Sequence, residues 1–232
     1  MITTINGWKK YKLNEGEEEP KYHNIFVPTR LDTRDIERTK QLTAQFYKEL
    51  ESTPNQVTGE LLADLLKFNP AFKIPDNLTV NGGLYLGNTL ITSLPNNLTV
   101  NGSLDLINTP ITSLPDNLTV NGYLDLSYTL ITSLPDNLTV NGTLDLRNTK
   151  ITSLPDNLTV NGGLYLYNTL ITSLPNNLTV NGCLDLSNTK ITSLPDNLIV
   201  NDSLWLTDTL IAKNKELLDE YKKKYKIVIY GI

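Results

Sequence analysis

Acidic and aromatic side chains recur at one position of a 20-residue interval along the middle of this chain. Asp105, Asp125 and Asp145 follow one another in this column without interruption. If they lie on neighbouring strands, like charges stand side by side, which destabilises a sheet. Such a column would suit a basic partner, a bound cation or partial protonation of the carboxyls. The alternative is a well-solvated column inherited by duplication. Calcium is disfavoured, because it takes about six to eight oxygen ligands and one column supplies too few.

The same column, together with the position two residues later, would supply binding surface rather than catalysis. Aromatic side chains dominate the energetics of protein interfaces, so Tyr and Trp are the expected anchors, with charges setting specificity. Core positions barely change between copies while these positions do, as expected of a face tuned for recognition, although drift on an unconstrained surface would look alike. The predicted protein-binding face consists of Tyr85, Asp105, Asp125, Asp145, Arg147, Tyr165, Tyr167, Asp185 and Trp205.

Catalytic constellations are missing from the sequence. The chain contains one histidine, His23, and one cysteine, Cys183, so a His-based metal site, a Ser-His-Asp triad and an internal disulfide are not expected. No paired acid/base and nucleophile arrangement stands out. We therefore expect a protein that is not an enzyme and holds no cofactor. A single cysteine also favours a reducing compartment.

The charge distribution bears on the partner. The net charge is −5, but residues 75–209 carry eleven Asp against three basic residues, whereas residues 210–232 carry a net +3. An acidic middle argues against nucleic acid, because phosphates need a basic face. No apolar run is long enough for a signal segment or a membrane-spanning helix. The expected partner is a protein, one with a basic surface if the Asp column contacts it, and the expected location is the cytoplasm, or the host cytoplasm or virion if the chain is phage-encoded.

An internal repeat dictates the fold. Prolines stand at 75, 95, 115, 135, 155, 175 and 195, and seven copies of one unit run to about residue 214, the last degenerate. Val80, Leu84 and Leu86 have the even spacing of one strand face, and Ile91, Leu94 and Leu98 supply further inward contacts. About six apolar side chains are too few for a coil to fold alone, so neighbours must stack. The unit predicts one short parallel strand, one turn and an extended return.

Small and polar positions of the unit have local roles. Gly82 and its counterparts indicate either a bulge or a positive φ. Thr89 and its counterparts are interpreted as internal residues whose hydroxyls satisfy backbone groups of the turn; the alternative is a surface β-branched residue. Asn77 and its counterparts match the glycosylation sequon but are interpreted as turn residues, as is the Asp/Asn column that begins at Asp76.

A family resemblance follows from these motifs. The segment Leu104-Asp105-Leu106-Ile107-Asn108-Thr109-Pro110-Ile111 resembles the leucine-rich repeat pattern Leu-x-Leu-x-x-Asn-x-Leu, with Thr109 where that family usually has Asn. The Leu94-Pro95 pair and the 20-residue length resemble the short class found in bacteria and their phages. The resemblance implies a curved solenoid with a concave strand face that binds protein, and no catalysis. The Thr variant leaves a straighter β-solenoid as the alternative to a horseshoe.

The two ends differ from the repeats. Residues 32–50 and 58–67 are predicted helices, the first with Ile36, Thr43, Phe46, Tyr47 and Leu50 on its apolar face. We expect them to cover the open end of the core, with a separate binding module as the alternative. After the last repeat, Asn214 can cap a helix to Lys224. A final strand over residues 225–230 follows, with Ile227 and Ile229 on one side, and is expected to close the open end. The expected domains are an extended or flexible arm (1–31), a helical cap (32–74), a leucine-rich-repeat-like solenoid (75–214) and a helix-strand cap (215–232).

The sequence therefore predicts a parallel β-sheet solenoid of seven coils with two caps, acting as a non-catalytic protein-binding scaffold. Two other functions stay open. One is a structural part or spacer of a phage particle, in which the ends dock. The other is an inhibitor of a host protein. The identity of the partner and the oligomeric state are open as well.

Overall fold

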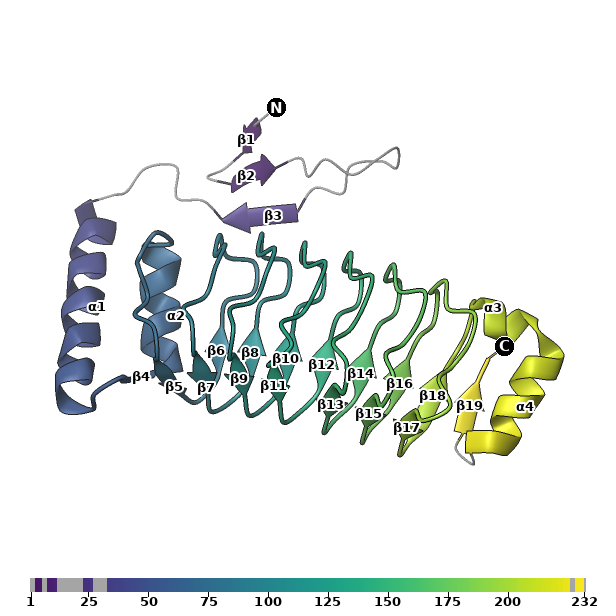
Figure 1. Ribbon diagram of the computed structural model, residues 1–232. Helices are drawn as coiled ribbons and strands as arrows, with labels where there is room; N and C mark the ends of the chain where they lie inside the picture. Colours follow the sequence, from purple (N-terminus) through teal and green to yellow (C-terminus); the bar gives the residue numbers. More distant parts are fainter. Residues whose placement is uncertain (1–2, 6–7, 12–22, 27–32, 226–227, 232) are drawn as a thin grey trace.

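The computed structural model describes residues 3–5, 8–11, 23–26, 33–225 and 228–231. It is a parallel β-solenoid of 20-residue coils, with helices at its N-terminal end and a helix and strand at its C-terminal end (Figure 1). The predicted fold class is thus confirmed. Each coil forms hydrogen bonds with the coils before and after it, so residues 20 apart in the sequence lie side by side.

Each coil contributes one strand to each of two parallel sheets, which we call sheet 1 and sheet 2. Sheet 1 contains β4 (Gln56–Thr58), β5 (Thr79–Asn81), β7 (Thr99–Val100), β9 (Thr119–Val120), β11 (Thr139–Val140), β13 (Thr159–Val160), β15 (Thr179–Val180) and β17 (Ile199–Val200). Sheet 2 contains β6 (Leu84–Tyr85), β8 (Leu104–Asp105), β10 (Leu124–Asp125), β12 (Leu144–Asp145), β14 (Leu164–Tyr165), β16 (Leu184–Asp185), β18 (Ser203–Trp205) and β19 (Val228–Tyr230).

The prediction of a single strand per coil is wrong. Val80 lies in sheet 1 and Leu84 in sheet 2, and the chain changes direction between them. Both side chains still point into the core, where both are fully buried. An even spacing of inward residues fits one strand as well as two short strands joined at a corner, so the spacing alone does not distinguish them.

The core is a set of stacked apolar columns. In the first repeat coil Val80, Leu84, Leu86 and Leu98 are fully buried and Ile91 nearly so, and their counterparts in the later coils are buried as well. The six predicted inward positions are therefore confirmed. A coil has no core of its own, so each buries its leucines against the neighbours above and below.

The glycines after the Asn81 column are explained mainly by close packing between coils. Only Gly82 has a positive φ, of 85°. A Cβ on Gly102 would lie 2.6 Å from the carbonyl carbon of Gly82, and one on Gly142 would lie 2.5 Å from the Gly122 oxygen. Glycine is required there because the backbones of successive coils approach each other directly.

Polar side chains satisfy the coil backbone, as predicted for the threonines. The Thr129 hydroxyl donates to the Leu126 carbonyl at 2.6 Å, and the same bond recurs in all seven coils, from Thr89 to Thr209. Thr109 to Thr209 are buried. The interpretation of Asn77 as a turn residue is also confirmed: Asn77, Asn97, Asn117, Asn157 and Asn177 adopt left-handed φ values between 55° and 62°.

Asparagine side chains form ladders between coils, which the sequence interpretation missed. In each ladder the amide Nδ2 of one coil donates to the amide Oδ1 of the coil before it. Asn97 bonds to Asn77 at 2.8 Å, Asn101 to Asn81 at 3.0 Å and Asn108 to Asn88 at 2.8 Å. These donors and acceptors come from different coils, so a single unit examined alone shows each Asn only as a turn residue.

The N-terminal helices are α1 (Thr33–Ser52) and α2 (Gly59–Phe68). Leu61, Leu62, Leu65 and Leu66 of α2 are buried, and α2 packs against β6, so it covers the end of the core as expected. The predicted face of α1 is partly wrong. Phe46 is buried together with Leu42, but Ile36 and Tyr47 are exposed, because only the narrow stripe against α2 is covered.

The C-terminal end forms the predicted cap. Helices α3 (Leu210–Lys213) and α4 (Lys215–Tyr225) follow the last coil, and the Asn214 side chain accepts the Leu217 N–H at 3.2 Å. Strand β19 then pairs with β18 in parallel and buries Ile229. Helix α3 was not predicted from the sequence. Thr209 caps this helix by accepting the Ala212 N–H with its hydroxyl oxygen.

The segment predicted as an extended arm contains three short strands. They are β1 (Thr3–Ile5), β2 (Trp8–Tyr11) and β3 (His23–Phe26), which form an antiparallel sheet in that order. The rest of residues 1–31 lies outside the described residues, as does Ile227. None of the helices in the described part of the chain combines the length and apolar composition of a bilayer-spanning helix.

Candidate protein-binding face

The outward positions of sheet 2 hold the residues that vary from coil to coil. Register places Tyr85, Asp105, Asp125, Asp145, Tyr165, Asp185 and Trp205 on neighbouring strands in one continuous column. The predicted column is therefore present, one strand spacing apart at each step. Cap strand β19 extends it, because Tyr230 pairs with Trp205.

Two tyrosines in this column lie over glycines. A Cβ on Gly83 would come within 2.6 Å of the Tyr85 ring, and one on Gly163 would lie 3.1 Å from the Tyr165 ring. In both coils the tyrosine ring occupies the space that a side chain two residues earlier would fill. Tyr85 remains 64 % exposed and Tyr165 is half-buried. The sequence contains this signal, since Gly and Tyr occur together in both coils.

The aspartates of the column each bind their own backbone. The Oδ1 atom of Asp105, Asp125, Asp145 and Asp185 accepts the N–H of the residue two positions later, at 2.9–3.0 Å. This bond holds the end of each short strand, so the carboxylates have a structural role that the solvated-column interpretation did not include. Burial raises the pKa of Asp105, with the nearby Asp125 charge adding to the effect.

A polar network occupies the centre of sheet 2. Asp145 is fully buried, and Arg147 binds it with Nε at 2.9 Å from both carboxylate oxygens and Nη2 at 2.5 Å from Oδ2. The Tyr123 hydroxyl lies 2.8 Å from Asp145 Oδ2 and 3.2 Å from Asp125 Oδ2. Burial and these hydrogen bonds raise the pKa of Tyr123, so it stays protonated as a donor. The hydrogen bonds to Asp145 likewise raise the pKa of Arg147.

This network decides which of the predicted residues can reach a partner. The buried Asp145 cannot, because its carboxylate pairs with Arg147 of the same chain. The Arg147 side chain is 47 % exposed and its guanidinium lies over the Tyr165 ring, 5.6 Å from the centroid. Arg147, Tyr165 and the exposed Tyr167 thus come from two neighbouring coils and form a central patch.

The structure adds aromatic residues that the sequence interpretation missed. Tyr230 stacks on Trp205 with ring centroids 4.2 Å apart, and both rings are exposed. Tyr128 is exposed as well and has a φ of 58° at a position where most coils have Asn. A left-handed backbone at a tyrosine costs about 1–3 kcal/mol. Its signal in the sequence is that it replaces Asn in an otherwise regular column.

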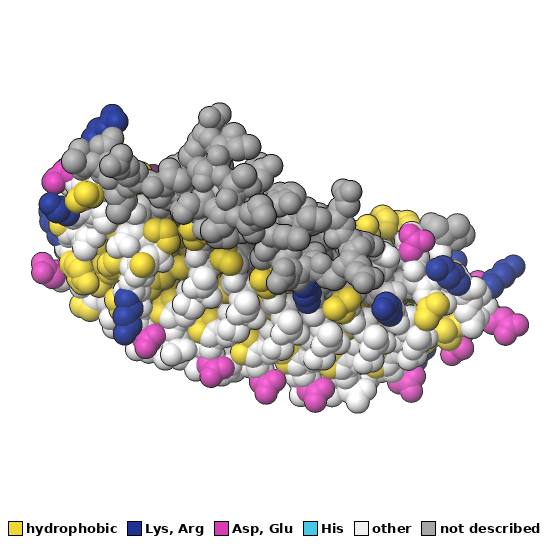
Figure 2. Space-filling view, turned by 90° about the horizontal axis from the view of Figure 1, so that it is seen from above, with side chains coloured by type: hydrophobic (Ala, Val, Ile, Leu, Met, Phe, Trp, Pro, Cys, Tyr) yellow, Lys and Arg dark blue, Asp and Glu magenta, His cyan; other side chains and the backbone are white. Residues whose placement is uncertain are grey.

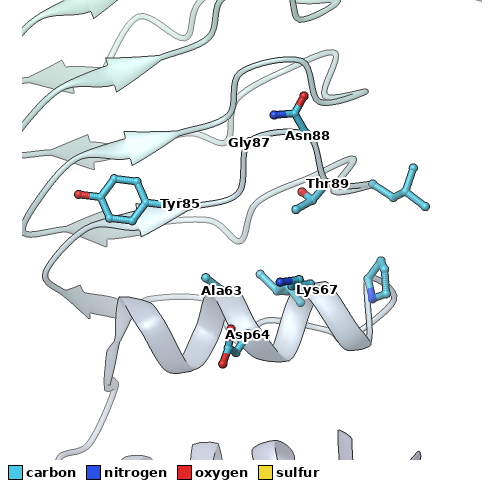
Figure 3. Close-up of a pocket in the computed structure, with 10 residues that line it drawn as sticks. Ala63, Asp64, Lys67, Tyr85, Gly87, Asn88 and Thr89 are labelled. Atoms are coloured by element: carbon cyan, nitrogen blue, oxygen red, sulfur yellow. The ribbon is translucent and has the colours of Figure 1, made fainter. Parts of the chain in front are cut away.

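A groove lies between α2 and the first repeat coil. It has a volume of about 460 Å³, and Ala63, Asp64 and Lys67 of α2 line it on one side (Figure 3). Tyr85, Gly87 and the turn at Asn88-Thr89 line the other side, so the groove adjoins the N-terminal end of the column. The face is therefore flanked by the groove beside Tyr85 at one end and the Trp205–Tyr230 pair at the other.

A second acidic feature lies outside sheet 2. The residue after the repeat proline is an exposed Asp in five coils, and Figure 2 shows acidic side chains following one another along one edge of the solenoid. The residues of this column lie in turns, as interpreted, and Asp76 Oδ1 accepts the Asn96 N–H of the next coil at 2.9 Å, so this side chain also joins two coils. Among the described residues, no group of three His, Cys, Asp or Glu side chains is arranged to hold a metal ion.

We predict that Asp105→Asn stabilises the protein slightly at neutral pH. Asparagine keeps the oxygen that accepts the Ile107 N–H, while the partly buried charge beside Asp125 disappears. A carboxyl whose folded pKa is raised contributes stability at low pH that is lost as the pH rises through that value. The gain should therefore vanish below about pH 4, the usual Asp pKa. Thermal unfolding at both pH values measures it.

Asp185→Asn is the matched control for this prediction. Asp185 makes the same backbone bond, to Ser187, but its neighbours in the column are Tyr165 and Trp205, which carry no charge. Its replacement should change the unfolding temperature less than Asp105→Asn does. Equal shifts for the two variants, or a loss of stability for Asp105→Asn at neutral pH, would contradict the role of the Asp105–Asp125 repulsion.

No protein-family model matches this sequence, and a search of curated proteins returns no relative. The candidate face is accordingly defined by the geometry above. Its members are the exposed aromatic residues and the Arg147 patch on the outward side of sheet 2.

Proposed function

We propose that the chain is a non-catalytic scaffold that binds a protein with the outward face of sheet 2. The face runs from the groove beside Tyr85, across Arg147, Tyr165 and Tyr167, to the Trp205–Tyr230 pair. The resemblance to short bacterial leucine-rich repeats supports protein binding, since the strand face is the binding face in that family.

One observation carries the proposal: variation is confined to part of the exposed surface. Thr92 and Ser93 are exposed, and the pair recurs unchanged through Thr192-Ser193. The outward residues of sheet 2 change far more often: the column that begins at Gly87 differs at every step, and the column that begins at Tyr85 differs everywhere except within its run of three Asp. If copies had drifted wherever they meet solvent, the exposed Thr-Ser turns should have drifted too. Selection on the sheet 2 face accounts for the difference.

The chemistry of this face fits recognition of a protein. Exposed Tyr and Trp offer large apolar area with little conformational freedom to lose, and both are enriched among residues that dominate binding energy. Arg147 is held in place by Asp145 and by the Tyr165 ring, so its remaining donors are pre-organised at low entropic cost.

The test compares two triple variants of the full chain. Tyr85→Ser, Tyr167→Ser and Trp205→Ala remove exposed anchors from sheet 2, and Thr92→Ala, Thr132→Ala and Thr172→Ala change the invariant turns. A partner identified by cross-linking in the native host is then purified and titrated against each. Each hot-spot anchor lost should weaken the affinity roughly thirtyfold, since such residues contribute about 2 kcal/mol. Equal affinity for both variants would refute the sheet 2 face.

The spacer and inhibitor functions give different results in other measurements. A particle spacer that docks through its ends should self-assemble or associate through the caps, so a monomeric chain that binds through sheet 2 argues against it. An inhibitor is a scaffold whose partner loses activity, so an activity assay of the identified partner separates it from a passive binder.

A further inference from the structure

Six asparagines in the corner between the two sheets are followed by glycine: Asn81, Asn101, Asn121, Asn141, Asn161 and Asn181. All six are exposed. Asn-Gly is the dipeptide at which an amide is most readily lost, because glycine has no side chain to hinder its own backbone nitrogen. That nitrogen attacks the Asn Cγ, the Cγ–Nδ2 bond breaks, and ammonia leaves with the glycine proton. Water then opens the cyclic imide to aspartate or isoaspartate.

The asparagine ladder restrains the side chain that this reaction needs. Attack requires the amide to rotate toward the following glycine, and the amides are bonded to one another from coil to coil. Asn101, Asn121, Asn141 and Asn181 donate to the preceding Asn at 3.0, 3.1, 2.8 and 3.0 Å. Asn81 donates to Gln56 of β4 at 3.2 Å, so the ladder is anchored in the N-terminal cap.

The backbone restrains the attacking atom as well. The N–H groups of Gly102, Gly122, Gly162 and Gly182 each donate to the carbonyl of the glycine one coil earlier, at 2.9–3.0 Å. A nitrogen held in that bond is directed away from its own asparagine side chain. Both reacting groups are thus engaged with the preceding coil at Asn101, Asn121 and Asn181.

The ladder is weakest around Asn141. The Asn161 Nδ2 lies 3.5 Å from the Asn141 Oδ1, the longest spacing in this ladder and at the limit of a hydrogen bond. Gly142 is also outside the set of four glycines with the inter-coil bond, as is Gly82 at the start of the row. In the last repeat coil Asn201 has no later coil to donate to it, and there the following residue is Asp202 in place of glycine.

We infer that the Asn-Gly row is a deamidation site held closed by the ladder, and that Asn81 and Asn141 react first in the folded protein. Conversion replaces a donating amide with a carboxylate that can only accept, so the bond to the preceding coil is lost. Each event also adds a negative charge to a solenoid that is already acidic.

The experiment follows deamidation of the intact chain by peptide mapping with mass spectrometry, in mildly alkaline buffer with and without urea. All six sites share the sequence Leu-Thr-Val-Asn-Gly, so they should react at similar rates in urea. In the folded chain Asn101, Asn121 and Asn181 should react roughly ten- to a hundredfold more slowly, as expected for two hydrogen bonds. Asn161, which keeps mainly its glycine bond, should be slowed less, and Asn81 and Asn141 should be the fastest. Folded rates equal to those in urea, or a first reaction at Asn101, Asn121 or Asn181, would overturn the inference.

Asn121→Ala tests the ladder itself. It removes the partner of both Asn101 and Asn141 while leaving Asn181 two coils beyond Asn141. Deamidation of Asn101 and Asn141 should accelerate, and that of Asn181 should not change. A rise at Asn181 as large as that at Asn101 would overturn the role of the ladder, because protection would then come from the fold as a whole.

Discussion

Replacing Leu124 and Leu126 together by alanine should move the urea unfolding midpoint of the protein far down, or prevent folding at working temperature. Both side chains are fully buried in the coil of β10. Each leucine-to-alanine change in a core costs about 2–5 kcal/mol. Globular domains have a total stability of about 5–15 kcal/mol, so the pair removes a large part of it.

The control for this variant is Leu170→Ala, which removes the same atoms from a side chain that is 48 % exposed. Its free energy of unfolding should stay within about 0.5 kcal/mol of that of the parent chain, as for most surface substitutions. An unchanged midpoint for the Leu124 and Leu126 variant would mean that the inward assignment of the column is incorrect. Because each coil contacts only its neighbours, the loss should appear as broadening of the transition as well as a shift.

Arg147→Ala should destabilise the protein by about 3 kcal/mol. The change leaves Asp145 buried with the Tyr123 hydroxyl and a backbone N–H but without its cation. Removing one partner of a buried ion pair costs about 3–5 kcal/mol, and the lower end applies because the guanidinium is half exposed. Urea unfolding at neutral pH measures the loss.

A second substitution identifies the cause of that loss. Adding Asp145→Asn to Arg147→Ala removes the unpaired charge. The asparagine side chain still has an oxygen that can accept the backbone N–H of residue 147. The double variant should therefore recover stability relative to Arg147→Ala alone. If it is no more stable than the single variant, Arg147 stabilises the protein by packing on Tyr165 rather than by pairing with Asp145.

Much of the fold follows from the sequence because the repeat copies one local solution many times. Residue type and spacing predicted the coil length and the six inward positions. They also predicted the hydroxyl bond of Thr129 and the cap strand that contains Ile229. The second sheet was not predicted. The corner between Val80 and Leu84 leaves the inward spacing even, so one strand and two strands give the same pattern.

The candidate site was less predictable, for a different physical reason. The column of Asp105, Asp125 and Asp145 follows from the repeat, but whether a carboxylate meets solvent depends on how a neighbouring side chain folds over it. Arg147 lies two residues after Asp145, and nothing in that spacing tells whether it extends outward or turns back. The asparagine ladders were missed because their bonds exist only between coils.

Sheet 1 gains its extra strand, β4, from the N-terminal cap, whereas sheet 2 gains β19 from the C-terminal cap. The caps therefore fit the two ends of the repeat array, and neither cap determines how many repeats lie between them. Removing residues 115–134, one complete repeat, would join Leu114 to Pro135, which is equivalent to Pro115. Every side-chain column and asparagine ladder would then continue in the same register. The length of the repeat array can therefore change only by whole coils. The two caps can be set closer or farther apart only in steps of about 4.8 Å.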